Sequence, residues 1–114
     1  MYQNLESGGN PPLRAASEPV VRPRDASSLI ITRRERQKIF VLMGRRSPTA
    51  RFMPGVFVFP GGAVSFGDGR VLPAAELDPT YTPLMGIGRS HSRARALAMA
   101  AVRETWEETG LLVA

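Results

Sequence analysis

The chain has 114 residues, of which 43% are hydrophobic, so its length limits it to one small domain. It has no cysteine, which excludes a disulfide framework and a cysteine-based zinc site, and its one histidine, His91, excludes a His-rich metal site. The formal net charge of +5 comes almost entirely from arginine, which suits contacts to phosphate, although a basic surface without a specific partner is an equally good interpretation.

No apolar run reaches the roughly 18 residues that a membrane-spanning helix needs. Residues 1–20 have no apolar core after a basic start, so we expect no secretory signal. We therefore expect a cytoplasmic protein that does not associate with a membrane. The composition leaves the oligomeric state open.

In chain order, residues 1–25 are rich in Gly, Pro, Ser and Arg and are predicted to form a flexible arm. The folded part is expected over residues 26–114. Apolar runs predict strands at residues 28–32 (SLIIT) and 38–43 (KIFVLM). The polar residues 33–37 between them predict a hairpin with a loop of about five residues.

A third short strand is predicted at residues 56–59, after the turn signal Pro54-Gly55. We expect this strand to break sharply at Gly61 and Gly62. Two glycines permit a positive φ or a close approach of the backbone to a ligand, and an ordinary tight turn is the alternative. Residues 65–90 contain many Gly and Pro residues and predict a long irregular insertion, which is typical of functional or disordered loops.

A helix is predicted from residue 93, with Ser90 or Ser92 as its N-cap, to about residue 109. Gly110 is expected to cap its C-terminus. We expect Trp106 to pack in the core.

Three carboxylates crowd the end of this helix. Glu104, Glu107 and Glu108 are spaced i, i+3 and i+4, so they share a face that continues the apolar stripe of Leu97 and Ala101. Their mutual repulsion, and their position near the negative end of the helix dipole, each cost about a few tenths of a kcal/mol. A hard divalent cation such as Mg²⁺ would remove the repulsion. The alternative interpretation is a solvated acidic face.

The segment R-E-T-W-E-E-T-G (residues 103–110) resembles the second half of the Nudix box, whose pattern is G-x5-E-x7-R-E-U-x-E-E-x-G-U. The upstream F-P-G-G (residues 59–62) resembles the strand and turn with which that box opens. This resemblance covers roughly residues 27–114. It implies an α/β fold with a mixed sheet in a Nudix-like α/β/α sandwich, of which the chain would be the N-terminal part of an incomplete domain.

The chain departs from the pattern in several respects, one of which is Thr105 at a position that is usually aliphatic. Gly62 and Arg103 are 41 positions apart where the pattern has 14, so the segment between them carries about 27 extra residues. The first box glutamate falls on Arg95 when counted back from Arg103 and on Asp68 when counted forward from Gly62. That acid is therefore missing or supplied across the insertion, and we expect Asp68 to be a turn residue rather than a ligand. The long insertion resembles the coenzyme A diphosphatase-like subgroup, although the subgroup's signature before the P-G-G is not matched.

The resemblance implies a hydrolase that cleaves a diphosphate linkage in a nucleoside diphosphate-X or coenzyme A-type substrate, with Mg²⁺ or Mn²⁺ as cofactor. Carried over by position, Glu104, Glu107 and Glu108 are the metal ligands and catalytic residues. Gly61 would offer a backbone carbonyl to a metal, and Arg103 would orient the glutamates. Which glutamate acts as the base stays open.

Three arginines, Arg45, Arg46 and Arg51, precede the F-P-G-G segment. We name Arg45 and Arg46 as candidate substrate-binding residues, because arginine suits phosphate, with a solvent-facing role as the alternative.

Two other functions compete with hydrolysis. One is a non-catalytic Nudix-fold module, or an inactive fragment, that binds a ligand. The other is a nucleic-acid-binding protein, which we do not expect because the arginines are dispersed and aromatic residues make up only 7% of the chain. The expected partner is a small-molecule diphosphate.

Overall fold

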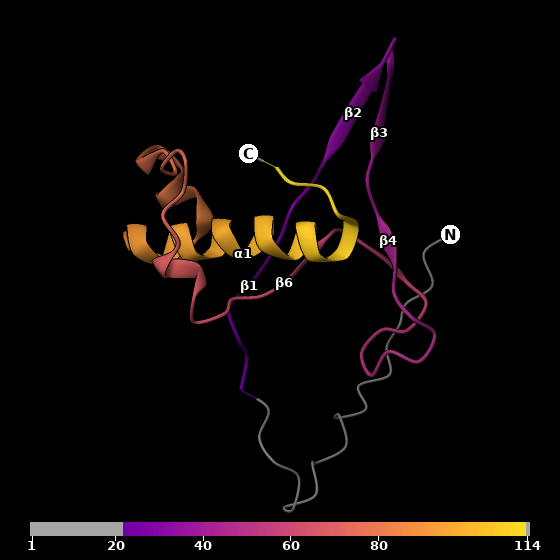
Figure 1. Ribbon diagram of the computed structural model, residues 1–114, viewed down its shortest axis with the longest axis horizontal. Coiled ribbons are helices and arrows are strands. Elements are labelled where there is room, and N and C mark those ends of the chain that lie inside the picture. Colours follow the sequence, from indigo (N-terminus) through magenta and orange to yellow (C-terminus); the bar gives the residue numbers. More distant parts are fainter. Residues whose placement is uncertain (1–21, 114) are drawn as a thin grey trace, which may run out of the picture.

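The computed structural model describes residues 22–113, which form three short antiparallel strand pairs and one long helix (Figure 1). The predicted flexible arm therefore lies mainly outside the described residues. None of the described helices is long and apolar enough to cross a membrane. The pairs are β1 (Ala26–Ser28) with β6 (Gly61–Ala63), β2 (Thr32–Glu35) with β3 (Lys38–Val41), and β4 (Gly44–Arg45) with β5 (Phe57–Val58); the helices are the 3-10 helices η1 (Asp68–Arg70) and η2 (Pro79–Met85) and the α-helix α1 (His91–Thr109).

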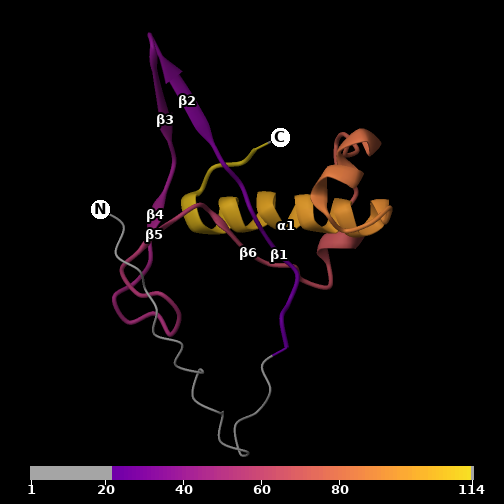
Figure 2. The same ribbon diagram turned by 180° about the vertical axis from the view of Figure 1, so that it is seen from behind.

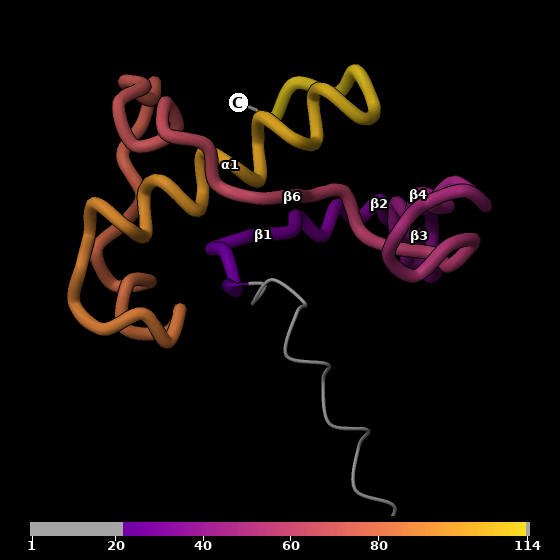
Figure 3. The backbone as a smooth tube through the Cα atoms, turned by 90° about the horizontal axis from the view of Figure 1, so that it is seen from below, coloured from indigo at the N-terminus to yellow at the C-terminus, as the bar shows by residue number. Residues whose placement is uncertain are grey.

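The small core lies where α1 meets β1, β6 and η1. Figure 3 shows β1 and β6 running side by side next to α1. The Ser27 hydroxyl donates a hydrogen bond of 2.7 Å to the Leu97 carbonyl, which links β1 to the middle of the helix. The buried apolar side chains of α1 lie on one face of the helix, as its spacing predicts, and they are Ala94, Leu97, Ala100 and Ala101.

Both ends of α1 follow local capping rules. Ser90 is the N-cap, and its hydroxyl accepts a hydrogen bond of 3.3 Å from the Arg93 N–H, so of the two predicted caps Ser90 is confirmed. Gly110 has φ +72°, and its N–H donates to the Trp106 carbonyl at 2.8 Å. The prediction that Trp106 packs in the core is wrong for the described part of the chain, since 55% of its surface is exposed. Thr105, one position earlier, is the fully buried side chain of this turn.

The predicted first strand is divided. β1 ends at Ser28 and β2 starts at Thr32, because the residues between them bond to different partners: the Leu29 N–H donates to Pro60, and the Ile31 carbonyl accepts from Leu42. The β2–β3 hairpin projects away from α1, and all of its strand residues are exposed (Figure 1).

The turn of this hairpin is shorter than predicted. Its polar residues continue β2 to Glu35, so the loop is two residues, 36 and 37, rather than about five. Arg36 has φ +54°, as tight two-residue hairpin turns require. Neither face of the hairpin is buried, so none of its positions requires an apolar side chain. Polar residues can therefore extend the strand as far as Glu35.

The F-P-G-G segment is only partly a break. β5 covers only Phe57–Val58, which is shorter by one residue at each end than the predicted strand at residues 56–59, and Gly61 and Gly62 then belong to a new strand, β6, paired with Ser28 and Ser27. A Cβ on Gly61 would collide with the Ser27 carbonyl, so glycine is required there by the close approach of β1 rather than by a turn.

The predicted insertion at residues 65–90 contains only the two 3-10 helices η1 and η2 as regular structure. η2 begins after Asp78, whose carboxylate accepts a hydrogen bond of 2.9 Å from the Thr80 N–H. Figure 2 shows the insertion gathered at the N-terminal end of α1, and both of its helices contact α1.

Candidate functional site

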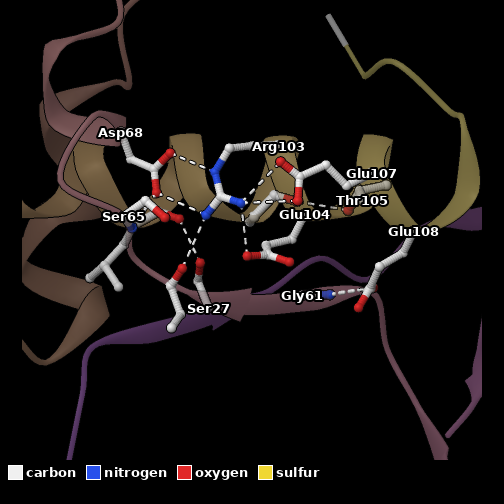
Figure 4. Close-up of polar contacts among 12 residues, drawn as sticks. Ser27, Gly61, Ser65, Asp68, Arg103, Glu104, Thr105, Glu107 and Glu108 are labelled. Atoms are coloured by element: carbon white, nitrogen blue, oxygen red, sulfur yellow. Dashed lines mark hydrogen bonds and ion pairs between the residues drawn. The ribbon is translucent and has the colours of Figure 1, made fainter. Parts of the chain in front are cut away.

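The C-terminal half of α1 lies against β6, and this contact depends on a missing side chain. A Cβ on Gly62 would lie 2.5 Å from the Glu104 Cδ and 2.7 Å from both of its carboxylate oxygens. Glycine at this position therefore leaves the space that the Glu104 carboxylate fills. The same strand carries Gly61, whose N–H donates to a Glu108 carboxylate oxygen at 3.2 Å (Figure 4).

Arg103 joins the glutamates of α1 to the insertion. Its Nη1 donates to Glu104 at 2.8 Å and to both carboxylate oxygens of Glu107 at 3.3 Å. Its Nη2 donates to the Ala63 carbonyl on β6 at 3.1 Å. The structure thus brings Arg103 into contact with two of the three predicted glutamates, and its charge offsets part of their mutual repulsion.

The strongest partner of Arg103 is Asp68. The Asp68 carboxylate accepts from Arg103 Nε at 2.8 Å and from Nη2 at 3.1 Å, and it also accepts from the Ser65 N–H at 2.7 Å. Only 3% of Asp68 is exposed. The hydrogen bond from Arg103, and to a lesser extent that from the Ser65 N–H, holds the pKa of Asp68 below its ordinary value although the carboxyl group is buried. The hydrogen bonds that Arg103 donates to Asp68, and then those to Glu104 and Glu107, raise the pKa of Arg103.

Asp68 is therefore more than the turn residue that we expected from the sequence. It opens η1, yet its carboxylate is directed at the arginine that contacts Glu104 and Glu107. The signal for this contact was present in the spacing, since counting forward from Gly62 reaches Asp68.

Arg95, the position reached by counting back, serves a different contact. It donates to Glu76 at 2.8 Å and to the Gly69 carbonyl at 3.0 Å, which ties the insertion to α1. The sequence pattern did not single out Glu76. His91, the first residue of α1, lies 3.8 Å from the same Glu76 carboxylate.

The residues predicted to hold a metal fall into two groups. Glu104 and Glu107 meet at Arg103, whereas Glu108 meets Gly61. Among the described residues, no three acidic or histidine side chains are already arranged as a metal site. The donor types nevertheless fit Mg²⁺, which prefers carboxylate and carbonyl oxygens. The Glu107 side chain is about half exposed, with 51% of its surface accessible.

A cavity of about 640 Å³ opens beside this cluster, a size typical of small-molecule sites. Glu108 and Gly61 line it together with the two predicted substrate-binding arginines, Arg45 and Arg46. Arg51 is exposed and is not part of the lining. The cavity therefore carries both acidic and basic groups in its wall.

A search of solved structures finds a similar protein, a NUDIX hydrolase from Alicyclobacillus acidocaldarius known from its crystal structure. The match has a TM-score of 0.61 and 34% sequence identity, and it covers 84% of this chain and 40% of that one. No family profile and no curated protein matches the chain. The α/β fold expected from the sequence is confirmed, and the identity indicates kinship as well as a shared fold. The chain spans less than half of that protein's length.

Proposed function

This chain is related to the Nudix hydrolase family, and from that premise we propose that the protein hydrolyses a diphosphate linkage with the help of Mg²⁺ or Mn²⁺. The substrate class is a nucleoside diphosphate-X or coenzyme A-type molecule. The observation that carries the proposal is the Arg103 cluster: one arginine holds Glu104 and Glu107 next to β6, while Glu108 faces a cavity that Arg46 also lines.

In this proposal Glu104, Glu107, Glu108 and the Gly61 carbonyl would hold the metal. A bound divalent cation supplies charge neutralisation on the diphosphate and lowers the pKa of the attacking water. Arg103 keeps Glu104 and Glu107 in place through its hydrogen bonds.

Two neighbouring groups support the cluster. Asp68 fixes the Arg103 guanidinium from the opposite side. Gly62 leaves the space that the Glu104 carboxylate occupies. Together they restrict where the glutamates stand before any ligand binds, which is how positioning residues contribute to catalysis.

The second candidate is a Nudix-fold module that binds a ligand without hydrolysing it. One observation favours it: Glu104 and Glu107 are both engaged by Arg103, and the described residues contain no ready metal cluster. Against it stands the presence of three mutually repelling carboxylates on one face of α1, which a pure binder does not need.

Hydrolysis of coenzyme A, ADP-ribose, NADH and nucleoside triphosphates by the full-length natural protein, measured in parallel with and without Mg²⁺, tests the proposal. Mg²⁺-dependent turnover of one substrate, lost in Glu107→Gln, is the expected result. Glu35→Gln removes an exposed carboxylate of the β2–β3 hairpin and serves as the control. Tight binding of a substrate without turnover would instead establish the non-catalytic module.

A further inference from the structure

Arg45 and Arg46 form the basic wall of the cavity, and β4 and β5 hold their backbone in place. The Arg46 N–H donates to the Val56 carbonyl at 2.9 Å, and the Arg46 carbonyl accepts from the Gly55 N–H at 3.2 Å. Next to it, Arg45 pairs with Phe57 in the strand register. These contacts fix the backbone of both arginines at the base of the loop formed by residues 46–55.

The two side chains differ in what they bind. Arg45 Nε donates to the Gly55 carbonyl at 3.1 Å, so this arginine spans the two ends of the loop. Arg46 Nε is buried and has no hydrogen-bond partner among residues 22–113. The Arg46 guanidinium carbon lies 6.0 Å from the centre of the Phe52 ring, at the outer limit of a cation–π contact.

A buried donor atom without an acceptor is unfavourable, and such atoms in proteins are normally paired. Among the described residues Arg95 Nε is also buried and unpaired, but Arg95 does not line this cavity. Arg46 lines the cavity that Glu108 and Gly61 also line, so an anion in the cavity can approach the guanidinium group, although Nε itself is covered. Arginine binds phosphate oxygens with its planar fork of donors. A phosphate oxygen is therefore one acceptor that suits the Arg46 guanidinium group.

We propose that Arg46 binds a phosphate group of the ligand in this cavity, and that Arg45 is a positioning residue that holds the 46–55 loop through Gly55. The inference deepens the proposed function, on which it rests for the identity of the ligand as a substrate. It requires a ligand whose phosphate reaches the basic wall while the rest of the molecule lies toward Glu108. The two arginines, treated alike by the sequence interpretation, thereby receive different roles.

The test is the binding of ADP and of inorganic pyrophosphate to the full-length protein in EDTA, measured by calorimetry. Arg46→Ala is expected to weaken binding roughly 10- to 100-fold, the effect of losing hydrogen bonds to a charged group. Arg46→Lys, which keeps the charge but not the fork, should fall between Arg46→Ala and the wild type.

Arg45→Ala separates positioning from contact. It should weaken binding less than Arg46→Ala and should also speed amide hydrogen exchange in residues 46–55, a change that Arg46→Lys does not produce. Arg34→Ala is the matched control, because it removes one exposed arginine on β2, outside the cavity. Circular dichroism melting curves of all variants show whether they fold.

Unchanged binding by both Arg46 variants would overturn the inference, as would a wild-type protein that binds neither probe. An equal loss in Arg34→Ala would also overturn it, because the effect would then be one of net charge. Since EDTA removes the metal, loss of binding in Arg46→Ala stands apart from hydrolysis. Arg46-dependent binding without any Mg²⁺-dependent turnover would support Arg46 and reject the hydrolase.

Discussion

Asp68 and Arg103 lie 35 positions apart in the sequence and form a two-point ion pair, with contacts of 2.8 Å at Arg103 Nε and 3.1 Å at Nη2. The pair joins η1 in the insertion to the helix that carries the glutamates. Arg103 also contacts Glu104 and Glu107, so a change at Asp68 reaches the candidate metal ligands through one side chain.

Replacing Asp68 with Asn should lower the free energy of unfolding by about 1–3 kcal/mol. The change removes a buried charge that accepts two hydrogen bonds from Arg103, although Glu104 and Glu107 continue to neutralise the arginine. Urea denaturation measures the loss. Glu35→Gln is the matched control, since its exposed pair with Arg33 should contribute less than about 1 kcal/mol. Equal effects of the two variants would contradict a structural role for the Asp68 pair.

The contribution of Asp68 to stability should depend on pH. Because the pKa of Asp68 is lowered in the folded protein, the unfolded chain binds its proton at a higher pH. The stabilisation is therefore complete above the unfolded pKa, about 4, and is lost as the pH falls through the folded value. Urea unfolding of wild type and Asp68→Asn from pH 7 to pH 2.5 should give curves that converge at the acidic end. A constant difference across this range would reject the ion pair as the cause.

The two glycines of β6 should respond differently to alanine. A Cβ at Gly61 meets the Ser27 backbone, which cannot move away easily, so Gly61→Ala should cost about 1–3 kcal/mol of stability. A Cβ at Gly62 meets the end of the Glu104 side chain, which can rotate, so Gly62→Ala should cost less stability but displace that carboxylate.

Thermal unfolding and Mg²⁺-dependent hydrolysis together distinguish the two glycine variants. Gly62→Ala should lower kcat about tenfold or more while shifting Tm less than Gly61→Ala does. Gly67→Ala is the control, because its φ is −74° and a Cβ there meets nothing within 4 Å. A Gly62→Ala variant with full activity would show that the position of Glu104 does not matter for catalysis.

Arg95→Gln should loosen the insertion. Arg95 binds Glu76 and the Gly69 carbonyl, so its loss should speed hydrogen exchange in residues 69–77. Arg93→Gln on the same helix is the matched control, because Arg93 pairs with Asp25, outside the insertion. Mass spectrometry of peptides should show faster exchange near Asp25 for that variant. Faster exchange over residues 69–77 in both variants would indicate general destabilisation of α1 instead.

The sequence by itself determined the helix that carries the site. Ser90 and Gly110 end α1 through hydrogen bonds within their own turns, and the spacing of Glu104, Glu107 and Glu108 follows from the helical repeat. These features depend on neighbours no more than four residues away, so a local pattern is enough to predict them.

Only the tertiary structure decided how the site is assembled. The pairing of β1 with β6 makes strand residues of Gly61 and Gly62, and the approach of η1 to α1 gives Arg103 its acidic partner. Each contact joins residues more than thirty positions apart. The contact between Asp68 and Arg103 depends on how the 65–90 insertion folds back over α1, and no local pattern of charge or hydrophobicity specifies that path. The exposure of Trp106 has the same origin, because which side of α1 is covered is decided by the strands and the insertion that pack against it.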